Sequence, residues 1–174
     1  IENDSTEFEC YPAWSPDGKW LYYVSAHFEF RDTIPHEAEC IKRSKEIKYS
    51  IYRKSFNPET MQFGPREMVF DAASLGKSAT LPRISPDGKY LLFSMGEWGC
   101  FHIWHRDADL YMLRLADNKV WPLTKTNSPQ AESFHNFSSN GKWIIFSSRR
   151  NDGDYTRLFF AHVDADGNTT KAFE

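Results

Sequence analysis

The sequence carries the stretch Trp14-Ser15-Pro16-Asp17-Gly18-Lys19-Trp20, and two related stretches follow it. Residues 84–90 read ISPDGKY, and residues 137–143 read FSSNGKW. In each copy an apolar residue and a serine lead into a turn, and glycine, lysine and an aromatic residue lead out of it. Three copies of one motif in 174 residues predict a repeat protein.

The residues of this motif favour a tight turn between two strands. Proline presets φ for the second position of a type I turn, and aspartate suits the third position. Glycine then adopts a positive φ at little steric cost. In the third copy Ser139 replaces proline and Asn140 replaces aspartate, and asparagine still tolerates the turn. The motif therefore predicts a hairpin with a bulge.

Each turn leads into a continuously apolar run, rich in aromatic and branched residues, which predicts a strand covered on both faces. A third and a short fourth strand follow in each unit. The expected second strands are residues 20–24, 90–93 and 143–146, the third strands are 51–56, 110–115 and 158–163, and the fourth strands are 67–70, 120–123 and 169–173. Four strands joined by hairpins are typical of a propeller blade. We therefore expect an all-β chain of three four-stranded antiparallel blades, a partial β-propeller.

The repeats also set the domain boundaries. We expect a single partial β-propeller domain over residues 1–174. Its blades are expected to span about residues 9–70, 79–125 and 132–174. The first blade exceeds the roughly 40–45 residues of an ordinary WD-type blade, because residues 26–48 are inserted between its second and third strands. Within this insertion, residues 35–46 are compatible with one or two helical turns, since proline at position 35 suits the first helical position.

The motif Ser-Pro-Asp-Gly-Lys between two strands, complete at residues 15–19 and 85–89, resembles the repeat of TolB-type propellers. These WD-repeat-like modules are common in bacterial envelopes, and the repeat also occurs in the propeller domains of prolyl-oligopeptidase-like peptidases. Residues 135–150 further resemble TolB-like proteins of Bacteroidetes-type bacteria. The resemblance implies a propeller over nearly the whole chain. It leaves the activity open, because propellers host many functions.

Composition argues against some partners. The formal net charge is −3, so a nucleic-acid partner, which needs a basic face, is not expected. No apolar run approaches the roughly 20 residues of a membrane helix, so no membrane span is expected in this segment. The chain begins at Ile1 and ends in an expected strand, so we expect it to be cut from a longer protein. The lack of a signal peptide then says nothing about location, and the resemblance implies the periplasm or cell envelope.

The three cysteines are Cys10, Cys40 and Cys100. Their odd number leaves at least one thiol unpaired in any intramolecular scheme, and their spacing matches no zinc, haem or redox motif. We expect small thiols that are buried or half-buried. The alternative is a Cys10–Cys40 disulfide in an oxidising periplasm.

Motifs for catalysis are missing from the sequence. It has no Gly-x-Ser-x-Gly nucleophile elbow, no phosphate-binding loop and no His-Glu-x-x-His zinc motif. Cys100, His102 and His105 are of types that bind transition metals, but a packed aromatic loop explains them without a metal. We therefore expect no catalytic, cofactor-binding or metal-binding residues and no enzymatic activity in this segment. A parent peptidase would carry its catalytic domain elsewhere.

Loops between the second and third strands are the expected binding region. They include residues 26–48, 96–108 and 149–155, and equivalent loops of successive blades lie on one rim of a propeller. Loops on a rigid scaffold often carry binding, and aromatic and arginine residues dominate interface hot spots. The alternative is structural: the rings pack between blades, and the arginines pair with Asp152 or Asp154. The candidate partner-binding residues are His102, Trp104, His105, Arg149, Arg150 and Tyr155.

These observations leave three functional hypotheses. The first is a non-catalytic TolB-like module that mediates protein–protein interaction in the bacterial periplasm or envelope. The second is the propeller domain of a prolyl-oligopeptidase-like peptidase whose catalytic domain is absent from this segment. The third is a propeller that binds a glycan or small ligand, for which Trp98, Trp104 and Trp121 would offer stacking surfaces.

Three blades make an incomplete ring, because propellers typically close with about four to eight. We expect apolar residues on the outer faces of the first and third blades to lack a neighbour, and we expect self-association of the segment as a result. The residues expected on these faces are Leu21, Tyr22, Phe159 and Phe160.

Overall fold

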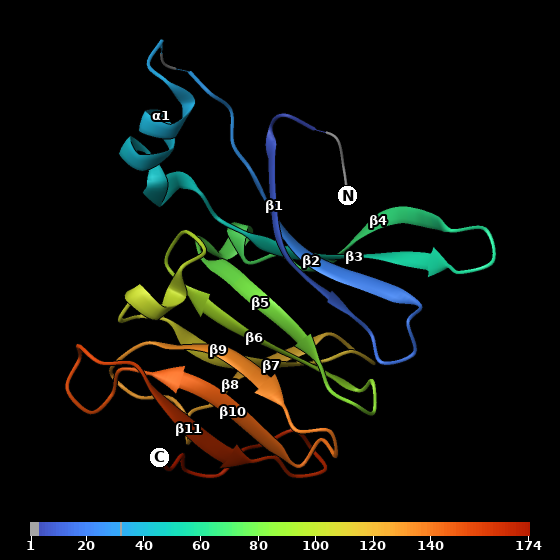
Figure 1. Cartoon of the computed structure of the whole chain (residues 1–174), viewed down its shortest axis with the longest axis vertical. Coiled ribbons are helices and arrows are strands. Elements are labelled where there is room, and N and C mark those ends of the chain that lie inside the picture. The colour runs from blue at the N-terminus through green and yellow to red at the C-terminus, as the bar shows by residue number, and fades with distance from the viewer. Residues whose placement is uncertain (1–3, 32) are drawn as a thin grey trace.

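The computed structural model describes residues 4–31 and 33–174. Sequence-based expectations for residues 1–3 and for Asp32 lie outside this part of the chain. Strands account for 46% of the structure and helices for 9%. The strands form three antiparallel sheets that follow one another along the chain and lie side by side in space (Figure 1). The expected all-β fold of propeller blades is confirmed.

The three sheets are named the first, second and third blades in chain order. The first contains β1 (Glu7–Trp14), β2 (Trp20–His27), β3 (Ser50–Asn57) and β4 (Gln62–Phe70). The second contains β5 (Ser78–Ile84), β6 (Tyr90–Gly96), β7 (Asp109–Arg114) and β8 (Lys119–Pro122). The third contains β9 (Glu132–Phe137), β10 (Trp143–Ser148) and β11 (Arg157–His162). Strand order in each blade follows the chain, with β10 between β9 and β11.

The third blade has three strands where the sequence predicts four. Residues 169–173 form two isolated bridges to the end of β11 and the residue after it, Phe160 with Phe173 and Val163 with Thr169. Between these bridges the backbone N–H of His162 donates to the side-chain hydroxyl of Thr170 at 3.0 Å. This side-chain bond interrupts the regular ladder, so the segment runs beside β11 without becoming a strand.

The three turn motifs have the geometry that the sequence predicts. In the first copy the Trp20 N–H donates to Ser15 Oγ at 2.9 Å, and Ser15 Oγ donates to Asp17 Oδ1 at 2.6 Å. The second copy repeats both distances. In the third copy the side-chain oxygen of Asn140 accepts the serine hydroxyl at 2.8 Å, which explains why it can replace aspartate. The three motif glycines have φ of 68°, 72° and 69°.

The first strand of each blade, called its innermost strand below, contains a bulge that the sequence analysis did not anticipate. Tyr11, Leu81 and Phe134 occupy matching places in β1, β5 and β9 and have φ of 54°, 55° and 47°. The ladder register shifts at these residues in all three blades. The left-handed conformation costs a non-glycine residue about 1–2 kcal/mol. Because the bulge recurs in all three blades, the bend that it gives the innermost strand is a regular feature of this type of blade.

The second strand of the middle blade is apolar on both faces because it supplies two cores. In β6, Leu91 and Phe93 belong to the core between the first and second blades, whereas Tyr90 and Leu92 belong to the core between the second and third. Successive side chains point to opposite faces of a strand. Full burial of one such side chain contributes about 1.5–3 kcal/mol, so these two cores hold the blades together.

The expectation for the outer faces was wrong for three of its four residues. Leu21, Tyr22 and Phe159 are buried, whereas Phe160 is 37% exposed. The register explains the error, because Tyr22 and Phe159 face the second blade and belong to the two interblade cores. Exposed apolar side chains do gather on the outer face of the third blade, where Phe173 contacts Trp143 and Phe160. This outer face comprises Trp143, Leu158, Phe160 and Phe173.

A charged and aromatic layer covers the outer face of the first blade. Tyr23 is fully buried and stacks on its cross-strand partner Tyr52, with ring centroids 6.1 Å apart. The guanidinium of Arg66 lies 3.6 Å from the centroid of the Tyr52 ring and pairs with Glu7 at 3.2 Å. The two outer faces therefore differ: charged groups cover the first blade, and apolar rings remain open on the third.

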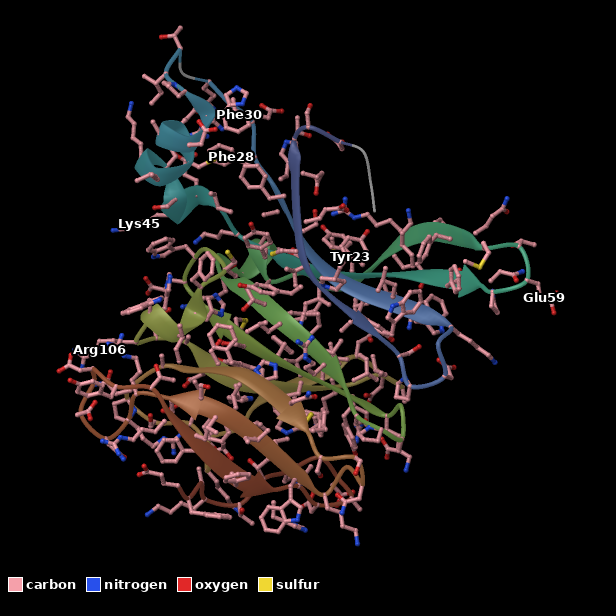
Figure 2. All side chains as sticks on the ribbon, viewed as in Figure 1. Tyr23, Phe28, Phe30, Lys45, Glu59 and Arg106 are labelled. Carbon is pink, nitrogen blue, oxygen red and sulfur yellow. The ribbon has the colours of Figure 1, made fainter. Side chains whose placement is uncertain are left out.

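The insertion of the first blade is partly helical, as expected, with α1 (His36–Lys42) and η1 (Ser44–Glu46). Phe28 lies between α1 and β1 (Figure 2), and the Arg43 guanidinium lies 4.4 Å from the centroid of its ring. Arg43 also pairs with the buried carboxylate of Glu39. The remaining helices are η2 (Ala73–Leu75) and η3 (His102–Trp104). Within residues 4–31 and 33–174, every helix falls short of the length and apolar character that a membrane span requires.

Candidate partner-binding rim

The loops between the second and third strands of all three blades lie at one edge of the molecule. Figure 1 shows α1, the loop with η3 and the connection from β10 to β11 on the left, and the three turn motifs toward the right. Equivalent connections fall on the same side because every blade has the same strand order. The edge formed by residues 28–31, 33–49, 97–108 and 149–156 is called the rim below.

Hydrogen bonds join the rim loops of the first two blades. The Gly99 N–H donates to the Ile47 carbonyl at 2.8 Å, and the Lys48 ammonium donates to the Glu97 carbonyl. The Ser78 hydroxyl, at the start of β5, donates to the Gly99 carbonyl at 2.7 Å. These contacts fix the start of the loop that carries η3.

Trp104 and Arg149 join the rim loops of the second and third blades. The Arg149 guanidinium lies 4.7 Å from the centroid of the Trp104 ring. It also donates to the Asp154 carbonyl at 2.7 Å and 3.1 Å, which holds it at the base of its own loop. Trp104 nevertheless remains 71% exposed and Tyr155 72% exposed. Two large aromatic side chains thus project from loops that are held in place by other contacts.

Arg150 belongs to the rim, but its mostly buried side chain stabilises the rim from below the surface. Its guanidinium pairs with the fully buried Glu132 at 2.9 Å and lies 4.6 Å from the centroid of the Phe159 ring. Ser128 and Ser148 donate hydroxyl hydrogen bonds to the same carboxylate oxygen at 2.6 Å and 2.9 Å. Burial raises the pKa of Glu132, and the hydrogen bonds and Arg150 act in the opposite direction. Removing one member of such a buried pair leaves the other charge uncompensated.

The two candidate histidines are also partly or fully enclosed. His102 is 1% exposed, and its Nδ1 lies 3.0 Å from Thr80 Oγ1 and 3.1 Å from Ser94 Oγ. Burial lowers the pKa of His102 to about 4, so its ring is neutral near pH 7. His105 is half-buried with its ring edge-on to Trp98, at a centroid distance of 4.4 Å, and burial lowers its pKa as well.

The structure therefore separates the six candidates by depth. Trp104 and Tyr155 are exposed, His105 and Arg149 are half-buried, Arg150 keeps only 16% of its side chain exposed, and His102 is buried. The sequence analysis overlooked Phe101, which is exposed and whose carbonyl accepts the Trp104 N–H at 3.0 Å. Phe101 stands in the stretch Trp98-Gly99-Cys100-Phe101-His102-Ile103-Trp104, and no sequence signal separates it from the apolar neighbours that are packed. The exposed rim surface is defined here by the exposed Phe101, Trp104 and Tyr155, together with the half-buried Arg149 that contacts Trp104.

Two clefts occupy the opposite edge, between successive turn motifs. One of about 470 Å³ lies between the turns of the second and third blades and is lined by Lys89, Tyr90 and Lys142 among others. The other, of about 400 Å³, lies between the turns of the first and second blades, and Asp87 lines both. The two clefts are alike because each lies where the turn motifs of two neighbouring blades diverge. Among the described residues, no group of three or more His, Cys, Asp and Glu side chains is arranged to hold a metal ion.

This arrangement of blades can be compared with solved structures. TolB from Acinetobacter baumannii aligns with 95% of this chain, with a TM-score of 0.54 and 22% sequence identity. The β-propeller domain of the Trilobed protease from Pyrococcus furiosus aligns with 97%, with a TM-score of 0.52 and 14% identity. The chain has the fold of a TolB-like β-propeller. A puromycin hydrolase shares this TolB-like fold over 95% of the chain, with a TM-score of 0.60 and 15% identity.

The TolB-like segment spans only part of each of these proteins. It corresponds to 32% of the Acinetobacter TolB chain, 43% of the Trilobed protease propeller chain and 23% of the puromycin hydrolase chain. The likeness therefore concerns the fold of a few blades. No protein family and no curated protein matches the sequence.

Proposed function

We propose that this chain is a non-catalytic TolB-like β-propeller module that binds a protein partner through the exposed rim surface. Residues 1–174 would act in this role as one partial propeller domain. The observation that carries it is the contact between Trp104 and Arg149, which places an exposed aromatic ring across two neighbouring loops. Tryptophan, tyrosine and arginine are the residue types that contribute most at protein interfaces.

The shape of the rim surface favours a protein over a small ligand. Small-molecule sites enclose most of the ligand in a cavity, whereas Trp104 and Tyr155 project outward with about seven-tenths of their surface exposed. The loops are held by backbone contacts at Gly99 and by the buried Arg150–Glu132 pair. A partner would thus meet a largely preformed surface, which limits the entropy cost of binding.

We place this module in the bacterial periplasm or envelope, on the strength of its resemblance to TolB-type propellers. The runner-up is a propeller domain of a prolyl-oligopeptidase-like peptidase, which is favoured by the fold similarity to the Trilobed protease propeller and to puromycin hydrolase. In that case the catalytic groups would belong to another domain, and the rim would contact that domain or its substrate. The glycan hypothesis is less favoured, because Trp121 packs edge-on against Tyr90.

Site-specific photo-crosslinking tests the proposal. A benzophenone amino acid replaces Tyr155 in one variant and Trp14 in another, since Trp14 is an exposed aromatic residue of the opposite edge. Each variant is irradiated in periplasmic extract, and the adducts are identified by mass spectrometry. We expect a discrete protein adduct at position 155 and none at position 14. The same adducts at both positions, or none at position 155, would count against a rim interface.

A further inference from the structure

Two of the three cysteines meet at the interface between the first and second blades. Cys10 lies in β1, and Cys100 lies in the loop between β6 and β7. Their thiols interact with one another, and both side chains pack against the core between these blades. The pair weighed from the sequence was Cys10 with Cys40, whereas the fold brings Cys100 to Cys10. The three thiols are free in this structure.

The backbone holds both residues in place. Cys10 pairs with Val24 in the ladder just before the inner-strand bulge, and the bulge residue Tyr11 donates its hydroxyl to the Cys100 carbonyl at 3.2 Å. On the other side of Cys100, the Gly99 N–H and carbonyl are bonded at 2.8 Å and 2.7 Å to groups outside this loop. Hydrogen bonds on both blades therefore hold the two cysteine residues in place.

The surroundings divide the chemical roles of the two thiols. The Cys10 thiol beside Cys100 lowers the pKa of Cys100, and the hydroxyls of Tyr11 and Tyr49 act in the same direction. The interaction with Cys100 raises the pKa of Cys10, and burial adds to the effect. Thiolates are the attacking species in disulfide exchange. Cys100 is thus suited to react first and Cys10 to react second.

We propose that Cys10 and Cys100 form a reversible disulfide that links the first blade to the rim loop of the second. The oxidant is a low-molecular-weight disulfide such as oxidised glutathione. The Cys100 thiolate attacks it, forming a mixed disulfide and releasing one glutathione thiolate. Cys10 then attacks Cys100 Sγ, forming the protein disulfide and releasing the second glutathione. Two protein thiols are oxidised, one external disulfide is reduced to two thiols, and the two protons pass to the released glutathione molecules.

This bond acts on the part of the rim next to the exposed surface. Cys100 immediately precedes Phe101, and the loop continues into η3 with Trp104. A covalent link between distant parts of the chain restricts the unfolded state more than a short-range link does. Oxidation should therefore raise the midpoint of thermal unfolding by several degrees. Reduction should restore the original midpoint.

Disulfide mapping of the wild-type protein tests the proposal directly. The folded protein is incubated with excess oxidised glutathione, its remaining thiols are alkylated, and its peptides are analysed by mass spectrometry. We expect the loss of two hydrogen atoms, a peptide pair joined through Cys10 and Cys100, and alkylation at Cys40. Alkylation of both Cys10 and Cys100, or a Cys10–Cys40 link, would overturn the proposal.

Two variants test the order of attack and exclude the third cysteine. Cys40→Ser should form the same disulfide as the wild type. Cys10→Ser should instead retain one glutathione on Cys100, because the thiol that displaces it is missing, and circular dichroism should confirm that this variant is folded. A glutathione adduct that persists on Cys100 in the wild-type protein would contradict a resolving role for Cys10.

Discussion

The guanidinium of Arg149 lies 4.7 Å from the centroid of the Trp104 ring, and this contact joins the rim loops of the second and third blades. A cation–π contact at an exposed site contributes about 0.5–1 kcal/mol. Arg149 also bonds the Asp154 carbonyl, so the arginine orients the tryptophan from a fixed position. The rim is therefore an assembly of two blades, which one isolated loop could not reproduce.

Gly88→Val should lower the free energy of unfolding by about 1–2 kcal/mol, since a left-handed conformation costs a residue with a side chain about that much. Gly88 has φ of 72°, and a Cβ at this position would meet nothing within 4 Å, so the cost is backbone strain and not a clash. Gly88→Asn should be milder, because asparagine tolerates positive φ. Urea denaturation measures both variants, and equal midpoints for Gly88→Val and wild type would contradict the turn geometry.

Lys89→Ala is the matched control for the same turn. Its ammonium pairs with Asp87 at 3.3 Å, but both side chains are at least half exposed. Exposed ion pairs contribute about 0–1 kcal/mol. The urea midpoint should therefore shift less than for Gly88→Val. A larger shift for Lys89→Ala would assign the stability of the turn to charge and not to backbone conformation.

Gly167→Ala should destabilise the protein more than Gly18→Ala. Both glycines have positive φ, but a Cβ on Gly167 would lie 2.8 Å from Tyr90 Cε1 and 3.0 Å from Trp121 Cζ2, whereas Gly18 has open space. Overpacking adds about 1–3 kcal/mol to the backbone strain. Thermal unfolding of the two variants compares these costs. Similar midpoints would show that the third blade does not press on the second at this turn.

Acid should weaken the fold through His135. Burial lowers the pKa of this histidine to about 3, from 6.5 in the unfolded chain. The unfolded state therefore binds more protons below about pH 6.5, and stability falls as the pH falls toward 3. At pH 5 this one group costs about 2 kcal/mol relative to pH 7.5.

The variant His135→Gln isolates this contribution. Its side-chain amide can still donate to the Leu81 carbonyl, which His135 Nε2 contacts at 2.7 Å. The difference in stability between pH 7.5 and pH 5, measured by urea denaturation, should shrink in the variant. His102 should preserve part of it, since its pKa is also lowered, to about 4. An unchanged difference would show that His135 is protonated in the folded state.

The outer face of the third blade should drive self-association. Trp143 in the third blade corresponds to Tyr90 in the second blade, and Phe160 corresponds to Met112. The third blade covers Tyr90 and Met112, whereas Trp143 and Phe160 have no further blade beside them in this chain. The double variant Leu158→Lys with Phe160→Lys should sediment as a monomer at concentrations where the wild type forms a dimer or larger species. A monomeric wild type at high concentration would contradict this prediction.

The sequence predicts the blades because the residues that determine each turn and each strand are neighbours in the chain. The turn at Gly88 and the apolar run of β6 each depend on residues that are close together in the chain. The outer-face error at Tyr22 and Phe159 arose because a strand that is apolar on both faces does not reveal which face meets which neighbour. The positive φ of Tyr11 was equally hidden, since no glycine or asparagine marks that bulge.

The candidate site was less predictable because it depends on tertiary contacts within and between blades. The residue types of the rim loops suggested binding, but the burial of His102 follows from contacts with Thr80 and Ser94 on other strands. The Cys10–Cys100 contact likewise requires the register of β1 against the second blade. Such contacts join residues far apart in the chain, and no spacing rule in the sequence encodes them.

The affinity of the crosslinked partner for Trp104→Ala is the most direct test of a rim interface. The partner identified through position 155 is purified, and its dissociation constant is measured by calorimetry for wild type, Trp104→Ala and the opposite-edge control Trp14→Ala. We predict at least about tenfold weaker binding for Trp104→Ala, equivalent to about 1.4 kcal/mol, and wild-type affinity for Trp14→Ala. Loss of the contact with Arg149 should lower the melting temperature of Trp104→Ala by no more than about 4 °C, so the variant remains folded in the assay. Equal affinities for Trp104→Ala and wild type would contradict the proposed function.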